Sequence, residues 1–114
     1  MLLLVDDDRE ILSSYTALLQ MSGYDVISCS SPLEAIEIFS QHKQQITTLI
    51  TDFRMPEMDG LQLIKTLRKE KPNLNTILCS GYMPDQVPEH ITTINKPINI
   101  DFLFSAIERE LTYE

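Results

Sequence analysis

The chain has 114 residues, of which 43% are hydrophobic, enough for a single domain with one ordinary core. Its formal net charge of −8 argues against a domain that itself holds nucleic acid, because phosphates require a basic face; it favours a cation or a positively charged partner. No apolar run approaches the roughly 18 residues of a membrane span and no signal-peptide pattern opens the chain, so we expect no membrane association. Cys29 and Cys79 lie far apart in apolar segments, as expected of reduced, buried thiols in a cytoplasmic protein.

Apolar runs typical of strands alternate with helical patterns along the whole chain. The predicted strands are Leu2–Val5, Tyr24–Cys29, Ile46–Thr51, Leu74–Cys79 and Ile91–Ile94. Helices are predicted from Ile11 to Leu19, from Pro32 to His42, from Leu61 to Lys71 and from Ile100 to Leu111. Asp8 and Asn99 are expected to cap helices, and Ser31 and Glu34 to form a capping box.

Alternating strands and helices build βαβ units, so the sequence predicts an α/β fold. We expect a doubly wound, five-stranded parallel sheet with helices on both faces, joined by right-handed crossovers. In such a sheet the functional crevice lies at the carboxyl ends of the strands, where the strand order reverses.

Polar residues follow the predicted strands at these carboxyl ends. Asp6 and Asp7 follow the first strand, Asp52 the third, Ser80 the fourth and Lys96 the fifth. Carboxylates about 4 to 6 Å apart repel each other and need a compensating charge. Mg²⁺ is the simplest compensation, because it prefers oxygen ligands and no His or Cys joins the cluster. The cation, Lys96 and Ser80 can hold the oxygens of a phosphoryl group, so Asp52 is placed to accept such a group.

The strings VDDD, TDFRMPEMDG, LCSGY and NKP, each at the end of its strand, resemble the receiver domain of two-component response regulators. The match covers essentially the whole chain, so residues 1–114 are expected to form one receiver domain. The resemblance implies a flavodoxin-like sheet of order 2-1-3-4-5. It also implies a phosphoacceptor that takes its phosphoryl group from a histidine kinase or a histidine phosphotransfer protein and then switches partner interactions.

The resemblance also implies a role for each matching residue. Asp52 would be the phosphoacceptor, and Lys96 and Ser80 would contact the phosphoryl group. Mg²⁺ would be held by Asp7, by Asp52, by the backbone carbonyl of Arg54 and, through a water, by Asp6. Lys96-Pro97 is expected to be a cis peptide.

The sequence departs from the family pattern in the region that reports phosphorylation. Thr93 stands where the family has a switching aromatic, three residues before the lysine, and Tyr82 is a candidate to replace it. The segment from 81 to 95 is short and contains Pro84 and Pro88, so the fourth helix is expected to be shortened or missing. Arg54 and Tyr82 flank the acceptor, and their bulk predicts slow self-dephosphorylation.

Two other functions compete with an active receiver. A phosphatase of the haloacid dehalogenase type needs Thr or Val where Glu10 stands, and a cap domain that the chain lacks. A phosphorylation-independent receiver-like interaction module is the stronger alternative, because the usual output surface must be altered. The sequence leaves open the cognate kinase, the downstream output domain or protein, homodimer formation, and whether the chain is stand-alone or belongs to a hybrid kinase or larger regulator.

Overall fold

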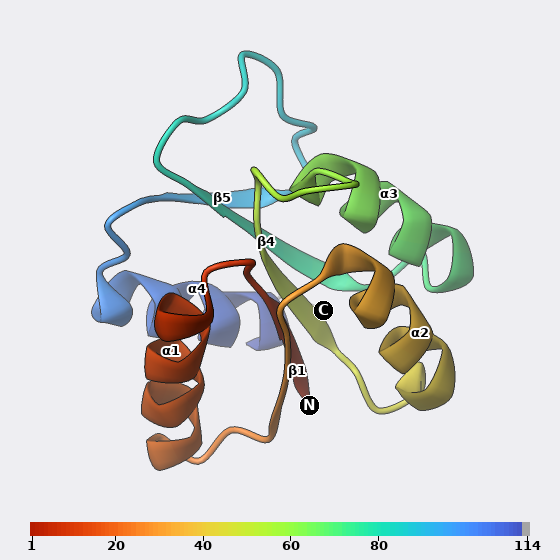
Figure 1. The fold of residues 1–114 in the computed structure, drawn as a ribbon. Helices are drawn as coiled ribbons and strands as arrows, with labels where there is room; N and C mark the ends of the chain where they lie inside the picture. The colour runs from red at the N-terminus through yellow and green to blue at the C-terminus, as the bar shows by residue number, and fades with distance from the viewer. Residues whose placement is uncertain (113–114) are drawn as a thin grey trace.

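A computed structural model describes residues 1–112, which form a five-stranded parallel sheet with helices on both faces (Figure 1). The strand order is β2-β1-β3-β4-β5, as predicted. The strands are β1 (Leu2–Val5), β2 (Val26–Cys29), β3 (Thr48–Asp52), β4 (Asn75–Ser80) and β5 (Thr92–Asn95). The helices are α1 (Arg9–Met21), α2 (Pro32–His42), α3 (Gly60–Glu70) and α4 (Ile100–Thr112). In Figure 1, α1 and α4 cover one face of the sheet, and α2 and α3 cover the other.

The central strand β1 is buried on both faces, which explains its continuous apolar sequence. Its side chains alternate between two hydrophobic cores. Leu3 and Val5 pack in the core under α2 and α3, while Leu2 and Leu4 pack in the core under α1 and α4. β1 pairs with β2 on one side and with β3 on the other, so the strand order reverses at β1. The carboxyl end of β1 therefore lies where ligands bind in such sheets.

Three strands extend one residue beyond their predicted ends. β3, β4 and β5 were expected to stop at Thr51, Cys79 and Ile94, but the parallel ladder includes Asp52, Ser80 and Asn95. The ladder pairs Asp52 with Cys79 and Ser80 with Asn95. The strands therefore hold the polar residues at their ends by backbone pairing, which fixes them more firmly than a loop would.

The helix that a doubly wound fold would place between β4 and β5 is missing, as predicted; the helix labelled α4 follows β5. Within the described part of the chain, residues 81 to 91 cross from β4 to β5 as a loop without helix, which projects beyond the sheet in Figure 1. Pro84 and Pro88 lack backbone N–H donors, so a continuous helix through both is disfavoured. Met83 and Val87 in the loop pack against the core, and Ile91 at its end belongs to the core.

Polar side chains cap the helices where the sequence indicates. The Asp8 carboxylate accepts hydrogen bonds from the backbone N–H groups of Glu10 and Ile11, and Asn99 does the same for the first turn of α4. Ser31 caps α2, as expected, although the full capping box is found at α3, between Asp59 and Gln62. Among the described residues, no helix has the length and hydropathy needed to cross a bilayer.

Candidate functional site

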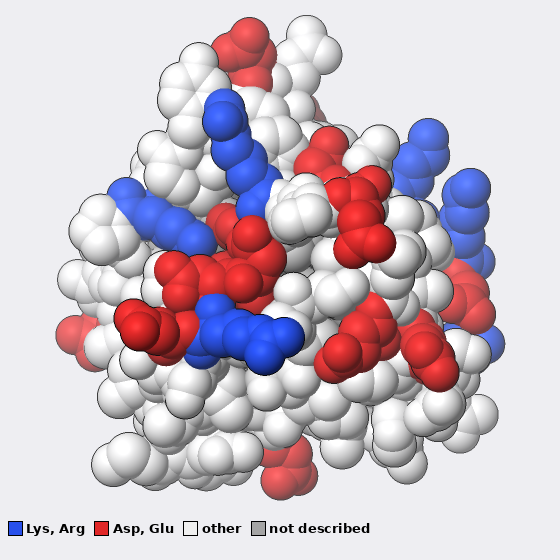
Figure 2. Space-filling view, in the orientation of Figure 1, with Lys and Arg blue, Asp and Glu red and all other residues white. Residues whose placement is uncertain are grey.

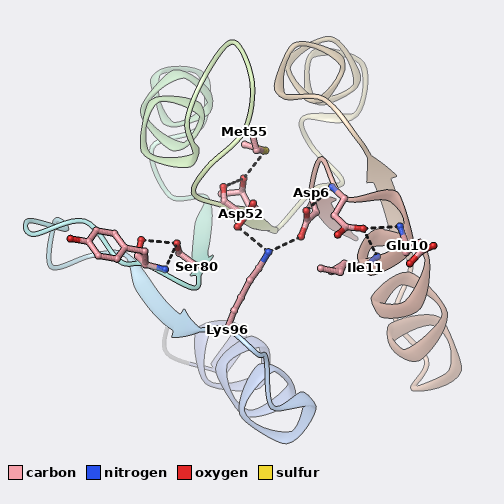
Figure 3. A network of polar contacts seen from close by, with 10 residues as sticks. Asp6, Glu10, Ile11, Asp52, Met55, Ser80 and Lys96 are labelled. Atoms are coloured by element: carbon pink, nitrogen blue, oxygen red, sulfur yellow. Dashed lines mark hydrogen bonds and ion pairs between the residues drawn. The ribbon is translucent and has the colours of Figure 1, made fainter.

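The parallel strands bring the predicted site residues to one edge of the sheet. Asp6 directly follows β1, Asp52 ends β3, Ser80 ends β4 and Lys96 directly follows β5. Figure 3 shows the Lys96 amine lying between Asp52 and Asp6, which come from neighbouring strands. The peptide between Lys96 and Pro97 is cis, as expected.

The Lys96 ammonium is the centre of the site. Its Nζ lies 3.0 Å from Oδ1 of Asp52 and 3.1 Å from Oδ2 of Asp6. Burial alone would lower the pKa of Lys96, but the hydrogen bond and charge of Asp52 and the charge of Asp6 raise it overall. Lys96 therefore stays protonated and holds two carboxylates in fixed positions.

Asp52 is in a conflicting electrostatic environment. Burial raises the pKa of its carboxyl above the ordinary value, the Lys96 ammonium opposes the increase, and the Asp6 charge adds to it. The side chain is 11% exposed, so it is largely removed from water and still reachable. A carboxylate in this setting gains from any further positive charge that approaches it.

Three carboxylates converge beside Lys96. Asp6, Asp7 and Asp52 each offer one oxygen, and these oxygens lie within 4.8 Å of one another. In Figure 2 a patch of acidic side chains lies in the middle of this face, with basic side chains around it. Asp6 is buried, Asp52 half-buried and Asp7 exposed, so the cluster opens to solvent on the Asp7 side. Hard oxygen donors at this spacing fit a divalent cation such as Mg²⁺.

Ser80 lies at the site, and its hydroxyl is turned away from Asp52. The Oγ donates a hydrogen bond to the Tyr82 carbonyl at 2.8 Å and accepts one from the Tyr82 N–H at 3.1 Å. Figure 3 shows these bonds on the side of Ser80 away from the Asp52–Lys96 pair. The hydroxyl would have to give up both bonds in order to reach a group on Asp52.

An Arg–Tyr contact stands next to the acidic cluster. The guanidinium of Arg54 lies 5.2 Å from the centre of the Tyr82 ring, within the range of a cation–π interaction. The sequence places both residues beside the acceptor but gives no sign that they touch. Only the fold brings the end of β3 and the end of β4 close enough for this pair.

Gly60 is a site residue that the sequence interpretation missed. A Cβ at this position would lie 2.3 Å from the carbonyl oxygen of Asp52, so only glycine lets α3 begin against the end of β3. Its N–H also donates to the Phe53 carbonyl at 2.8 Å. Asp59 caps α3 and Gly60 begins it, and the close approach to Asp52 is the reason that a glycine stands there.

A doubly wound parallel sheet with an acidic, lysine-bridged site at the carboxyl ends of its strands is the arrangement of receiver domains. The chain belongs to this family: the family model described as the response regulator receiver domain matches residues 2–108. Among curated proteins it is 34% identical to the transcriptional regulatory protein GlrR of Escherichia coli over 96% of this chain, and 28% identical to the receiver protein CpdR of Brucella abortus over 96%.

Solved structures agree with this assignment. The receiver domain of the hybrid histidine kinase CckA superposes with a TM-score of 0.88 and 30% identity, covering 97% of this chain and 98% of that chain. A receiver domain from Clostridium thermocellum gives a TM-score of 0.93 at 26% identity, covering 98% and 94%. The relatives differ in length: the chain spans 26% of GlrR but 95% of CpdR.

Proposed function

We propose that the chain is a phosphoacceptor that receives a phosphoryl group on Asp52 in a Mg²⁺-dependent reaction. The observation that supports this most directly is the position of Asp52, which is ion-paired to Lys96 at 3.0 Å and shares an acidic cluster with Asp6 and Asp7. As a member of the receiver family, the chain would have a regulatory role in signalling. Its only chemistry would be transfer of a phosphoryl group to its own Asp52 and hydrolysis of the resulting acyl phosphate.

Each site residue has a role in the proposed reaction. Mg²⁺ would be held by Asp7, Asp52, the Arg54 backbone carbonyl and, through a water, Asp6, and when bound it would neutralise charge on the phosphoryl oxygens. A carboxylate oxygen of Asp52 attacks phosphorus in line with the leaving group. The O–P bond forms as the N–P bond of a phosphohistidine breaks, and the electron pair passes to the imidazole nitrogen.

Lys96 and Ser80 are proposed to hold the phosphoryl group after transfer. The Lys96 ammonium already contacts Asp52 and can pair with a phosphoryl oxygen attached to it. Ser80 can donate its hydroxyl once it leaves the Tyr82 carbonyl. The Tyr82 backbone is hydrogen-bonded to the Ser80 hydroxyl, so turning this hydroxyl towards Asp52 releases Tyr82. The release of Tyr82 is the proposed start of the change that partners detect.

The proposed donor is a histidine kinase or a histidine phosphotransfer protein, and the proposed receiver domain spans residues 1–114. Relatives on both sides of such a pathway support this, since they include the regulator GlrR and the sensor kinase CckA of Brucella abortus. A downstream output domain or protein, and a homodimer, are part of the proposal. So is a cytoplasmic location, with which the free, buried Cys29 and Cys79 are consistent.

The proposal is tested by phosphorylation in vitro. The chain is incubated with Mg²⁺ and a small acyl phosphate, and intact-protein mass spectrometry measures addition of a phosphoryl group. We expect modification of the wild type that is abolished by EDTA and by Asp52→Asn. Asp8→Asn is the matched control: it removes a nearby carboxylate but keeps a good helix cap, so modification should persist. An unmodified wild type would favour the phosphorylation-independent interaction module instead.

A further inference from the structure

A groove of about 440 Å³ lies between α3 and the end of the loop that replaces the fourth helix. Its floor and one wall are apolar, with Leu61 and Ile64 from α3 and Pro88 and Ile91 from the loop. The groove follows from the missing helix, because the loop packs onto this core through Met83, Val87 and Ile91 and leaves a hollow along α3. None of these residues belongs to the acidic site.

The groove has fixed walls. Arg68, on α3, donates from Nη2 to the Leu74 carbonyl at 2.8 Å, to Thr76 Oγ1 at 3.2 Å and to the His90 carbonyl at 3.4 Å. These bonds tie α3 to the sheet and to the end of the loop. The Ile91 N–H also donates to the Pro88 carbonyl at 3.1 Å, which closes a turn on the opposite wall. The binding surface is therefore preformed, and a ligand loses little binding free energy in ordering it.

The rim of the groove is positively charged in a protein of net charge −8. Lys65, Arg68 and Lys69 are three of the nine Lys and Arg residues, and all three line this groove. Figure 2 shows basic side chains projecting at the right edge of the molecule, on the side where Figure 1 places α3. The acidic loop residues Asp85 and Glu89 do not line the groove; they line an adjoining hollow that shares Pro88 with it.

The fold does not explain this charge by itself. Lys65 and Lys69 are exposed one helical turn apart, where like charges repel, and neither has an acidic residue three or four positions away on α3. The helix dipole favours cations in the last turn, which accounts for Arg68 and Lys69 but not for Lys65. An external negative charge would remove the repulsion.

We propose that this groove binds an acidic amphipathic helix of a partner protein. Its apolar ridge would lie over the half-buried Leu61 and the exposed Pro88, above the buried Ile64 and Ile91. Acidic residues on its flank would face Lys65 and Lys69. The α3 stripe from Leu61 to Lys69 is about 12 Å long, which suits about two turns of a bound helix. A nucleic acid is disfavoured because the rest of the domain is strongly acidic. The proposal does not depend on phosphorylation of Asp52.

The test uses a designed peptide of about 15 residues that forms an amphipathic helix, with Leu along one face and Glu beside it. Binding is measured by fluorescence anisotropy of the labelled peptide, and amide chemical shifts locate the site on the intact chain. We expect shifts confined to α3 and residues 88–91. We expect Lys65→Glu with Lys69→Glu to weaken binding about tenfold, with a smaller loss for Lys65→Gln with Lys69→Gln.

The matched control is Arg9→Glu with Lys43→Glu, which changes the net charge equally at exposed positions outside the groove. This control should leave the affinity within about twofold, because distant surface charges are screened. Leu61→Gln should also weaken binding; because Leu61 packs against the core, the variant's amide spectrum must show that it stays folded. The proposal is overturned if the peptide does not bind at millimolar concentration, if a peptide with Lys in place of Glu binds equally, or if the control variant loses as much affinity. Equal binding of single-stranded DNA would also overturn it, in favour of a general anion site.

Discussion

Lys96 connects two carboxylates that would otherwise repel each other. Asp6 is almost fully buried and also accepts the Asp8 N–H at 2.9 Å, so its position is fixed by two donors. Asp52 has less compensation, and burial together with Asp6 raises its pKa in spite of Lys96. The fold therefore disfavours the charged form of the residue that is proposed to accept phosphate.

This imbalance gives a prediction for stability in the absence of divalent cations. Because folding raises the pKa of Asp52, its stabilising contribution is complete below the ordinary carboxyl pKa and is lost as the pH rises through the raised pKa. Asp52→Asn should therefore be more stable than the wild type at neutral pH. The difference should shrink as the pH falls towards about 4, measured by urea unfolding in EDTA.

Saturating Mg²⁺ supplies the internal check on this prediction. If the ion binds the wild type through Asp52, it stabilises the wild type more than Asp52→Asn, and the order of stabilities narrows or reverses. Asp8→Asn serves as the control in both buffers. If Asp52→Asn is less stable than the wild type at neutral pH in EDTA, the electrostatic argument is contradicted.

The Arg54–Tyr82 contact leads to a prediction about the lifetime of the acyl phosphate. Arg54 follows Asp52 by two residues and Tyr82 follows Ser80 by two, and their contact brings two bulky side chains together at this edge of the sheet. We expect the pair to hinder an attacking water. Arg54→Ala combined with Tyr82→Ala should shorten the half-life of phosphorylated Asp52 several-fold, measured by loss of the label after donor removal. Phe102→Ala is a suitable control, since Phe102 and Tyr82 are both 68% exposed. A half-life that hardly changes in the double variant removes the argument.

The start of α3 determines where β3 can end. Asp59 and Gln62 form a capping box, and the following Gly60 packs directly on the Asp52 carbonyl. The capping box stabilises the first turn of the helix, and Gly60 holds this turn against the end of the strand by its close backbone contact and its N–H bond to the Phe53 carbonyl. Displacing either would move the acceptor relative to Lys96.

Gly60→Ala should destabilise the fold, although Ala is the better helix former by up to about 1 kcal/mol. The new methyl would lie 2.3 Å from the Asp52 oxygen and 2.7 Å from the side chain of Leu78, so strand and helix must separate. We expect a loss of about 1–3 kcal/mol in unfolding free energy, as for other overpacked sites. Phosphorylation of Asp52 should also slow.

Gly81→Ala is the matched control for this prediction. Its Cβ would meet no atom closer than 4.0 Å, and its φ is not in the left-handed region. Urea unfolding should place Gly81→Ala within about 0.5 kcal/mol of the wild type. Equal stability of the two variants would show that the close approach at Gly60 can relax at no cost.

Sequence patterns identify the elements better than their ends. β3, β4 and β5 continue through Asp52, Ser80 and Asn95, residue types that hydrophobic patterns assign to loops. Ladder hydrogen bonds involve only the backbone, so a polar side chain does not end a strand whose neighbour continues. The predicted capping box at Ser31 and Glu34 shows the same limit, because Ser31 caps α2 as expected but Glu34 interacts with Cys29 instead. Burial, with the charge and hydrogen bond of Glu34, raises the pKa of the Cys29 thiol to about 12.

The fold of the whole molecule follows from the sequence with few ambiguities. Five apolar strands separated by helical patterns allow little besides a parallel sheet, and right-handed crossovers restrict its order. The missing helix is predictable because Pro84 and Pro88 interrupt too short a segment. The course of the resulting loop is not predictable, and neither are the features that depend on it, the groove beside α3 and the contact of Tyr82 with Arg54.

The loop from 81 to 91 also determines how fast the molecule can respond. It begins at the Tyr82–Ser80 hydrogen bonds, so this end can open locally while the Pro88–Ile91 turn and the sheet stay intact. Loop motions of this kind take nanoseconds to microseconds, whereas rearrangement of a packed helix takes longer. Under the proposed function, each opening frees the Ser80 hydroxyl. The chain would then sample the signalling geometry often, and the lifetime of the acyl phosphate would set the duration of the signal.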